Sequence, residues 1–414
     1  MLKLNNPTNI RQIIICSTLS ERPVVIENYK AFEGGLSSSE LKFLRLVELI
    51  STGAKFLISK NGSTIKYYPG IITNNDSNQF EYDCGNERNI SYFLYPLLIL
   101  ALFGKNRLNA KLKGITNDTQ DISVDMFSNS ILPQIKKFGI EGELLVKVLK
   151  RGYKPEGQGE ILFKCPIVRH LKAINLKERG KIKRIRGICA GAQINPSILN
   201  RIISSSREIL NDYLPDVWIY SDFQKGNNQE KQKTSPGYSV SLVAEYNNGQ
   251  LISIDQCSIE NGSPEQNLAE KIGKEAALSL LDEILYCGFV DSNSQSMFLT
   301  LMSLSEKKIS SIRLGRITPF TVENLRIIRE FFGVTFKILP EDTQNKELEE
   351  EEEEENEKEQ NGENQNEDNM DIQDNQSNSN QENKEEFDLS LYNIQHMIFS
   401  CYGAGLSNMS RVTN

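Results

Sequence analysis

A helix, a glycine and a strand follow one another three times along the chain, at residues 41–58, 132–148 and 325–338. Gly53, Gly139 and Gly333 stand where each helix should end, because glycine readily adopts the left-handed conformation that closes a helix. Each unit must bury one face of its helix against a sheet, so the pattern predicts an α/β (α+β) fold of three repeated αβ units. In the alternative interpretation, the succession of helix, glycine and strand is not a repeat, because many unrelated helices end at a glycine.

A different pattern separates the second copy from the third. Strands are predicted at residues 181–194, 217–223, 238–246 and 251–257, and helices at 196–213 and 267–287. Asn195 and Pro196 are typical of the cap and the first position of a helix. A run of about 100 residues can fold alone, so residues 183–286 are predicted to form a smaller inserted αβ domain. The loop at 224–236 is expected to be exposed and mobile.

An acidic segment follows the third copy. Residues 341–388 contain 21 Asp and Glu and three Lys, a net charge of −18, whereas the other residues carry +10. Residues 344–386 have almost no aromatic or β-branched side chain, so this stretch is predicted to be disordered. The basic remainder favours polyanions such as nucleic acid as partners. The predicted divisions are 1–182 (first part of the repeat domain), 183–286, 287–342 (third repeat), 343–388 (acidic insertion) and 389–414 (last strand and tail).

Local signals predict further elements. These are two strands in residues 10–28, a helix at 41–50 capped by Ser37, a hairpin about Asn61-Gly62, and helices at 91–103 and 121–138. Pro96 suits the first of these two helices only in its first turn, and Pro133 should kink or break the second. Asp291 and Ser292 are predicted to cap a later helix.

The cysteines and the apolar segments limit the class of protein. Seven cysteines are scattered without C-x-x-C spacing, which argues against a disulfide framework and a zinc site and favours a reducing compartment. The longest apolar segment, residues 92–103, is too short to span a bilayer, and the N-terminus has no signal-peptide pattern. We therefore expect neither a membrane nor a bound cofactor.

The stretch 308–339 has the framework of a catalytic site, a strand, a loop and a helix N-terminus that could hold phosphate. The loop residues are Thr318, Pro319 and Phe320, and none is a good acid, base or nucleophile. The chain has only two histidines, His170 and His396, and neither has an evident catalytic partner in the sequence. We interpret both as structural or incidental.

Basic residues gather before and within the inserted domain. Residues 147–186 contain 13 Lys and Arg against three Glu. The residues predicted to contact RNA phosphates are Arg151, Lys181, Lys183, Arg184 and Arg186. A solvated surface is the alternative, although it usually mixes both signs. The glycines of residues 151–159 suit either a phosphate-binding loop or a simple hairpin.

Two arginines lie one turn apart on the predicted helix 321–332. Arg326 and Arg329 fall on its polar face, and the predicted buried stripe is Val322, Leu325, Ile328 and Phe332. The arginines suit docking of a partner protein. Surface ion pairs of Arg326 with Glu323 and Glu330 are the alternative.

Short motifs spread over the chain resemble the RNA 3′-terminal phosphate cyclase family, and within it the cyclase-like branch. They include Arg11-Gln12, Ser17-Thr-Leu-Ser-Glu-Arg-Pro23, Tyr68-Pro-Gly70, Lys113-Gly-Ile-Thr-Asn117, Ser123-Val-Asp125, Gly157-Gln-Gly-Glu160, Ser241-Leu-Val-Ala-Glu245 and Ser400-Cys-Tyr-Gly403. The resemblance implies three αβ repeats like the C-terminal domain of a translation initiation factor, with an inserted αβ domain. Each motif is weak alone, but their order and spread make the resemblance specific.

The resemblance also implies that cyclase chemistry is absent. The cyclases use a histidine nucleophile in a Ser-x-His-x-x-Thr-Asn motif, and the aligned position here is Phe320. Their Gly-Gly-Gly-Gln run near the N-terminus is replaced by Asn5-Asn-Pro-Thr-Asn9, with Arg11 retained as a candidate RNA-binding residue. No enzymatic activity is therefore expected.

The cyclase-like branch implies a role in ribosome assembly. Its members are expected in the nucleus and nucleolus, within the small-subunit processome, where they bind pre-rRNA and a GTPase partner and support early pre-rRNA cleavage. The resemblance assigns GTPase binding to Arg326, and Arg329, one turn further along the same helix face, is the second candidate for this contact. The alternative is that the chain is itself the pre-rRNA endonuclease.

Overall fold

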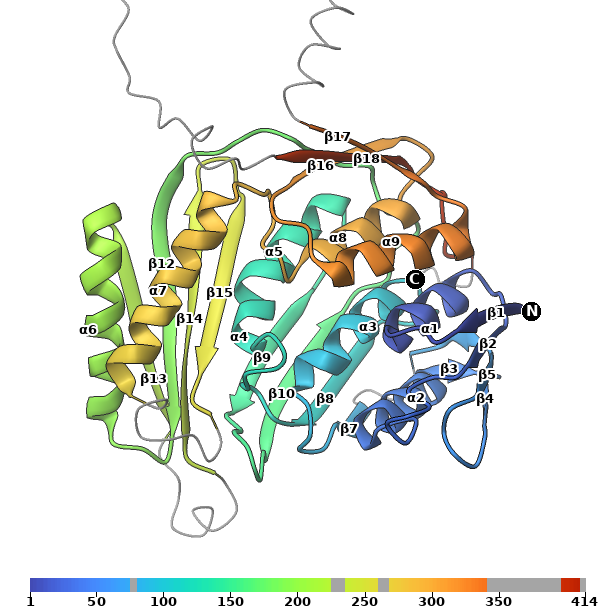
Figure 1. The fold of residues 1–414 in the computed structure, drawn as a ribbon, viewed down its shortest axis with the longest axis horizontal. Coiled ribbons are helices and arrows are strands. Elements are labelled where there is room, and N and C mark those ends of the chain that lie inside the picture. Colours follow the sequence, from blue (N-terminus) through green and yellow to red (C-terminus); the bar gives the residue numbers. More distant parts are fainter. Residues whose placement is uncertain (75–79, 225–234, 260–267, 341–395, 410–414) are drawn as a thin grey trace, which may run out of the picture.

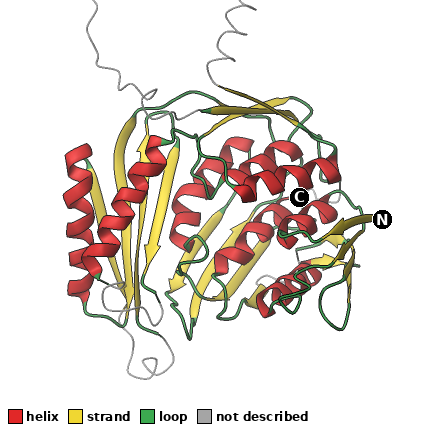
Figure 2. Cartoon of the chain, in the orientation of Figure 1, coloured by secondary structure: helices red, strands yellow, loops and turns green. Residues whose placement is uncertain are grey.

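The computed structural model describes residues 1–74, 80–224, 235–259, 268–340 and 396–409. The predicted acidic insertion and most of the predicted mobile loop at 224–236 lie outside these ranges. Four of the sheets have four strands each. Figures 1 and 2 show the sheets with helices packed on them. The predicted α/β class is confirmed.

Three of the four-stranded sheets share one topology. Their strand orders are β1 (Leu2–Asn5), β2 (Val24–Glu27), β5 (Ile65–Tyr68), β4 (Lys55–Ile58); β7 (Phe80–Asp83), β8 (Leu108–Gly114), β10 (Gly159–Cys165), β9 (Leu145–Lys150); and β11 (Asn175–Leu176), β16 (Ile309–Leu314), β18 (Met397–Tyr402), β17 (Phe336–Pro340). In each sheet the first two strands are parallel and the other neighbours antiparallel. A parallel crossover followed by an antiparallel pair thus occurs three times, as three αβ repeats would give.

Two helices accompany each of these sheets. The first helices are α1 (Ile10–Leu19), α3 (Ile90–Leu102) and α8 (Gln295–Leu304). The second are α2 (Ser38–Ile50), the irregular helix of α4 (Val124–Met126), a π-helical stretch and α5 (Leu132–Ile135), and α9 (Pro319–Phe332). A short sheet of β3 (Ser51–Thr52) and β6 (Ile71–Ile72) extends the first repeat.

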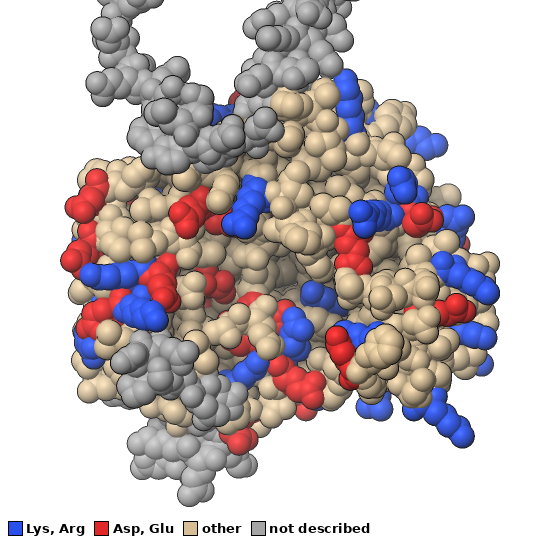
Figure 3. Space-filling model, viewed as in Figure 1, with Lys and Arg blue, Asp and Glu red and all other residues tan. Residues whose placement is uncertain are grey.

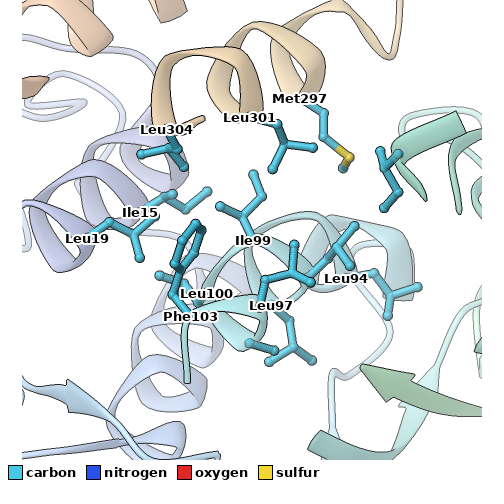
Figure 4. Packing of buried hydrophobic residues seen from close by; sticks show 14 of the residues in the cluster. Ile15, Leu19, Leu94, Leu97, Ile99, Leu100, Phe103, Met297, Leu301 and Leu304 are labelled. Atoms are coloured by element: carbon cyan, nitrogen blue, oxygen red, sulfur yellow. The ribbon is translucent and has the colours of Figure 1, made fainter. Parts of the chain in front are cut away.

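The main core lies where the first helices of the three repeats meet. Figure 4 shows Ile15 of α1, Ile99 of α3 and Leu301 of α8 pointing toward one another. All three side chains are fully buried and belong to one hydrophobic cluster that extends over all three repeats. Burial of a side chain of this size contributes about 1.5–3 kcal/mol, so this junction joins the three repeats into one domain.

The inserted domain forms a separate layer. Its elements are β12 (Ile182–Ala192), α6 (Pro196–Tyr213), β13 (Val217–Gln224), β14 (Gly237–Tyr246), β15 (Leu251–Cys257) and α7 (Ala269–Leu285), and the sheet order is β13, β12, β14, β15. Every helix and strand predicted there is present. Helices α6 and α7 cover one face of the sheet (Figure 1) and share with it a second hydrophobic cluster.

The insertion interrupts the third repeat instead of preceding it. Strand β11, before the insertion, pairs in parallel with β16, after it, and is therefore the first strand of the third sheet. The prediction placed the insertion between the second and third copies. Strand β11 has only two residues, Asn175 and Leu176, in a basic stretch, so no alternation of apolar side chains marked it.

The prediction of two strands in residues 10–28 is half wrong, because helix α1 replaces the first strand. Ile13, Ile14 and Ile15 are all fully buried, so the helix is surrounded by the core on nearly every side. A short apolar run of β-branched residues does not distinguish a strand from a helix buried all round. Tertiary packing decides between them here.

Pro96 lies in the middle of α3, not in its first turn as predicted. Proline has no N–H, so the carbonyl of Tyr92, four residues earlier, loses its helical partner. Arg11 of α1 supplies the missing donor, because its Nη1 lies 3.0 Å from that carbonyl oxygen. An interhelical hydrogen bond thus replaces the one that proline removes.

The predicted helix cap at Ser37 and the predicted hairpin about Asn61-Gly62 are confirmed. Helix α2 begins with the capping box of Ser37 and Glu40, and β4 pairs with β5 as a hairpin. The helix after residue 121 does not break at Pro133: a π-helical stretch, Phe127–Ile131, lies just before α5, which contains Pro133. The helical run ends at Gly139, which has a φ of +76°. Within the described ranges, no helix is both long and apolar enough to cross a membrane.

Candidate functional site

The loop between β16 and α9 has the predicted framework but few free polar groups. Thr318 is the helix cap, and its Oγ1 accepts a hydrogen bond from the Thr321 N–H at 3.1 Å. Pro319 occupies the first helical position and has no N–H to offer to an anion. Phe320 follows, with 42% of its surface exposed. The helix start therefore has one donor used, one donor absent and an apolar side chain in front of it.

A carboxylate from α9 occupies the neighbouring backbone donors. Glu323 Oε1 accepts the N–H groups of Thr8 and Asn9, at 2.9 and 3.2 Å, and Glu323 Oε2 accepts the Thr8 hydroxyl. These two amides lead into helix α1. An external phosphate at this place would have to displace a carboxylate of the same sign.

Arg11, a predicted RNA-binding residue, has a structural explanation. Besides its bond to the Tyr92 carbonyl, its guanidinium lies 4.0 Å from the centre of the Tyr92 ring. Arg88 approaches the same ring, at 4.5 Å, and pairs with Asp121. Arg11 therefore joins α1 to α3 and does not lie with the basic residues of β12.

Arg151 lies at the seam between the second repeat and the inserted domain, and only 4% of its surface is exposed. Its Nη2 lies 2.9 Å from Asp125 Oδ1, in α4, and 2.7 Å from Asp222 Oδ2, in β13. Its Nη1 also donates to Asp125. Burial alone would lower the pKa of Arg151, but the Asp125 carboxylate outweighs burial, so the pKa is raised. A guanidinium enclosed in this way is not available to an RNA phosphate.

Two further carboxyl groups are buried near the same seam. Burial raises the pKa of Asp255, in β15, to about 7, although the backbone N–H of Ser123 donates to its carboxylate. Burial likewise raises the pKa of Asp291 to about 6. Asp291 accepts hydrogen bonds from Ser294 and from Ser253 of the inserted domain, and Ser294 is the residue that caps α8. The prediction that Asp291 and Ser292 cap this helix is wrong by two or three positions.

The predicted basic residues of β12 lie together at the start of that strand. Arg184 pairs with Glu245 at 2.7 Å, and Arg186 pairs with Asp216 at 2.8 Å. Lys181 and Lys183 are exposed, and neither forms an ion pair with another described residue. The run of one sign in the sequence is thus partly balanced by acids from other strands. Mixed signs are also seen over the face in Figure 3.

Arg326 and Arg329 are exposed on α9, as predicted. Neither makes an ion pair in the part of the chain that the structure describes, so the predicted pairs with Glu323 and Glu330 do not form there. The predicted stripe is wrong in its register. The buried residues of α9 are Thr321, Asn324, Ile327, Ile328 and Phe331, because polar Thr321 and Asn324 turn inward to bond with α8.

The remaining candidates are the two histidines, the loop 151–159 and the cysteines. His170 is exposed, and His396 is half-buried at the start of β18. The loop 151–159 is a hairpin in which the Gly157 N–H donates to the Tyr153 carbonyl at 2.8 Å. Within the ranges that the structure covers, no group of three or more His, Cys, Asp or Glu is placed to hold a metal. All seven cysteines are buried free thiols.

These features define a three-repeat α/β protein with an inserted domain and with the exposed Phe320 near the start of the helix in the strand–loop–helix. The family described as RNA 3′-terminal phosphate cyclase matches residues 6–338, and the chain belongs to this family. It is 43% identical over 361 residues to a probable RNA 3′-terminal phosphate cyclase-like protein of Dictyostelium discoideum, covering 84% of this chain and 96% of that protein.

Two other relatives have similar coverage. The RNA 3′-terminal phosphate cyclase-like protein of Homo sapiens is 42% identical over 332 residues, which are 80% of this chain and 87% of that protein. The rRNA processing protein rcl1 of Schizosaccharomyces pombe is 36% identical over 342 residues, 81% of this chain and 89% of that protein. The family resemblance seen in the sequence motifs is therefore confirmed.

Proposed function

We propose that the protein acts in rRNA processing as a binding factor and not as an RNA 3′-phosphate cyclase. The observation that carries the proposal is Phe320, an apolar side chain at the position where the family resemblance places the nucleophilic histidine. Pro319 and Glu323 support it, because one removes a backbone donor and the other fills two neighbouring donors. The name of the Schizosaccharomyces pombe relative, an rRNA processing protein, indicates the pathway.

The finer parts of the proposal concern partners and place. The protein binds pre-rRNA and a ribosome-assembly GTPase, within the small-subunit processome of the nucleolus, and supports early pre-rRNA cleavage. Arg326 and Arg329 are the proposed GTPase contacts, since they are exposed and without an ion pair to any other described residue.

The absence of cyclase chemistry is tested with radiolabelled ATP. The purified chain should form no covalent AMP adduct under conditions in which an active RNA 3′-terminal phosphate cyclase, as positive control, does. A labelled adduct on this chain would contradict the proposal. Incubation of the same preparation with a pre-rRNA fragment tests the endonuclease alternative, which specific cleavage products would favour.

The GTPase contact is tested with Arg326→Ala. This change should weaken binding of the GTPase by about thirtyfold or more, since a hot-spot arginine contributes 2 kcal/mol or more, and leave the thermal stability unchanged. Arg45→Ala is a matched control, because Arg45 is exposed and lies eight residues after the cap of α2, as Arg326 does after the cap of α9. Equal binding by the two variants would refute the assignment.

A further inference from the structure

Two large aromatic side chains are exposed side by side on the sheet of the inserted domain. Trp218 and Tyr220 alternate along β13, at the edge of the sheet, and each has 57% of its surface exposed. Their ring centres lie 6.0 Å apart and their planes are inclined by 59°. Val217 and Ile219, which alternate with them, are buried against the helices. The two rings therefore lie on the face of the sheet that α6 and α7 leave uncovered.

The uncovered area is limited to the first residues of β13 and the neighbouring residues of β12, because Asp222, further along β13, already pairs with Arg151 of the second repeat. On the same face, further across the sheet, Ser241 of β14 bonds to Ser123, and the carboxylate of Asp255 in β15 accepts the Ser123 N–H. The second repeat therefore covers β14 and β15. Edge strands usually carry charged residues that discourage pairing with other chains. Adjacent exposed aromatic rings on an edge strand are a feature that stability alone does not explain.

Basic groups lie next to the rings. In the sheet register, Arg186 is beside Trp218, and Ile188 is beside Tyr220. Arg186 keeps its pair with Asp216 at the surface, where a phosphate can compete with the carboxylate because the Asp216 side chain is 55% exposed. Lys181 and Lys183 extend the positive charge along the first residues of β12, and neither is paired with a described acid.

Rings beside cations fit unpaired nucleotides better than they fit other ligands. Exposed aromatic side chains on a sheet stack on the bases of single-stranded nucleic acid, while Arg and Lys contact the backbone. A base in a duplex already has stacked neighbours on both sides, so a double helix would not use the rings. An acidic peptide would use the cations but would offer the rings no planar base.

We propose that Trp218 and Tyr220 form a stacking platform for two unpaired bases of single-stranded RNA, with Arg186 and Lys183 at the adjoining phosphates. The proposal rests on the proposed function in so far as RNA is the ligand. In this proposal, two aromatic residues that the basic run did not indicate take the RNA-binding role predicted for the buried Arg151 and the interhelical Arg11. It also assigns the RNA to one face of the inserted domain.

Trp218 is the only tryptophan of the chain, so its fluorescence reports on this face directly. A single-stranded oligoribonucleotide of about 12 residues should quench the tryptophan emission of the full chain, and a duplex of the same sequence should not. Tyr220→Ala should weaken oligonucleotide binding, measured by anisotropy of a labelled strand, by about fivefold to a hundredfold, as expected for one lost stacked base. Tyr402→Ala is the matched control, because Tyr402 is 59% exposed on the sheet of the third repeat.

The outcomes separate the platform from the wider proposal. If the oligonucleotide binds but leaves the tryptophan emission unchanged, and Tyr220→Ala binds as well as Tyr402→Ala, the platform is refuted while RNA binding by the protein stands. If no oligonucleotide binds to the wild-type chain, the platform and the RNA-binding part of the proposed function both fail. Quenching by an acidic peptide and not by RNA would overturn the platform, because it identifies a protein partner for this face.

Discussion

Replacement of Arg151 by methionine should destabilise the protein strongly. The guanidinium is 4% exposed and pairs with Asp125, whose side chain is 7% exposed, and with Asp222, whose side chain is 53% exposed. Methionine fills much of the same volume but has no charge. The Asp125 carboxylate would then be buried at the seam without a cation, while Asp222 could turn to water.

The two ion pairs should contribute unequally. Loss of one partner of a buried pair costs about 3–5 kcal/mol, because a buried charge is left uncompensated. The exposed pair with Asp222 adds about 0–1 kcal/mol. We therefore expect Arg151→Met to lower the free energy of unfolding by roughly 4 kcal/mol. The double variant Arg151→Met with Asp125→Leu should recover most of the loss, since an apolar replacement of a whole buried pair is often neutral.

Urea unfolding followed by tryptophan fluorescence measures these changes, since Trp218 lies on the same strand as Asp222. Arg201→Met is the control. Arg201 also pairs with a carboxylate through two hydrogen bonds, to Glu270, but both side chains are at least 40% exposed, so its loss should be much smaller. An Arg151→Met variant as stable as the wild type would refute the reasoning. So would a double variant no more stable than Arg151→Met.

Two further changes test the interior. The pKa of Asp255 in the folded protein, about 7, is above its ordinary value of 3.8. The folded state therefore binds the carboxyl proton more tightly than the unfolded state does. The stabilisation of the folded state by this proton is lost as the pH rises from about 4 to about 7. Asp255→Asn should therefore become more stable relative to the wild type over that window, by a few kcal/mol at most; parallel pH profiles of the two melting temperatures would contradict this. Arg11→Ala should cost about 1–3 kcal/mol because it leaves the buried Tyr92 carbonyl unpaired, and Pro96→Ala, which restores the helical N–H, should rescue it in thermal melts; additive losses would show that the carbonyl is not the cause.

Most of the fold could be predicted from the sequence where local signals act alone. Asn195 and Pro196 fixed the start of α6, and Gly333 fixed the end of α9, with a φ of +69°. The site was harder to predict because its partners are far apart along the chain. Arg151 meets Asp222, 71 residues away, and Glu323 meets Thr8, 315 residues away. No local pattern distinguishes a buried, paired arginine from one that binds phosphate.

Some missed features did leave a signal in the sequence. A proline in a buried helix indicates a carbonyl that needs another donor, so Pro96 predicts a partner for Tyr92, although it does not identify Arg11. The chain's single tryptophan lies in a predicted strand, where it could have faced either the helices or the solvent. Val217 and Ile219 alternate with Trp218 and Tyr220 along the strand. Once the helices are placed over Val217 and Ile219, the two aromatic side chains must face the solvent.

The polar groups at the start of α9 form hydrogen bonds within the protein. Thr318 caps α9, and Glu323 joins α9 to the two amides before α1. Each of these bonds replaces a contact that an external anion could have made. Together with the bonds from Thr321 and Asn324 to α8, these contacts hold α9 against α1 and α8. This anchoring fixes the direction in which Arg326 and Arg329 face solvent, as the proposed docking of a partner on α9 requires.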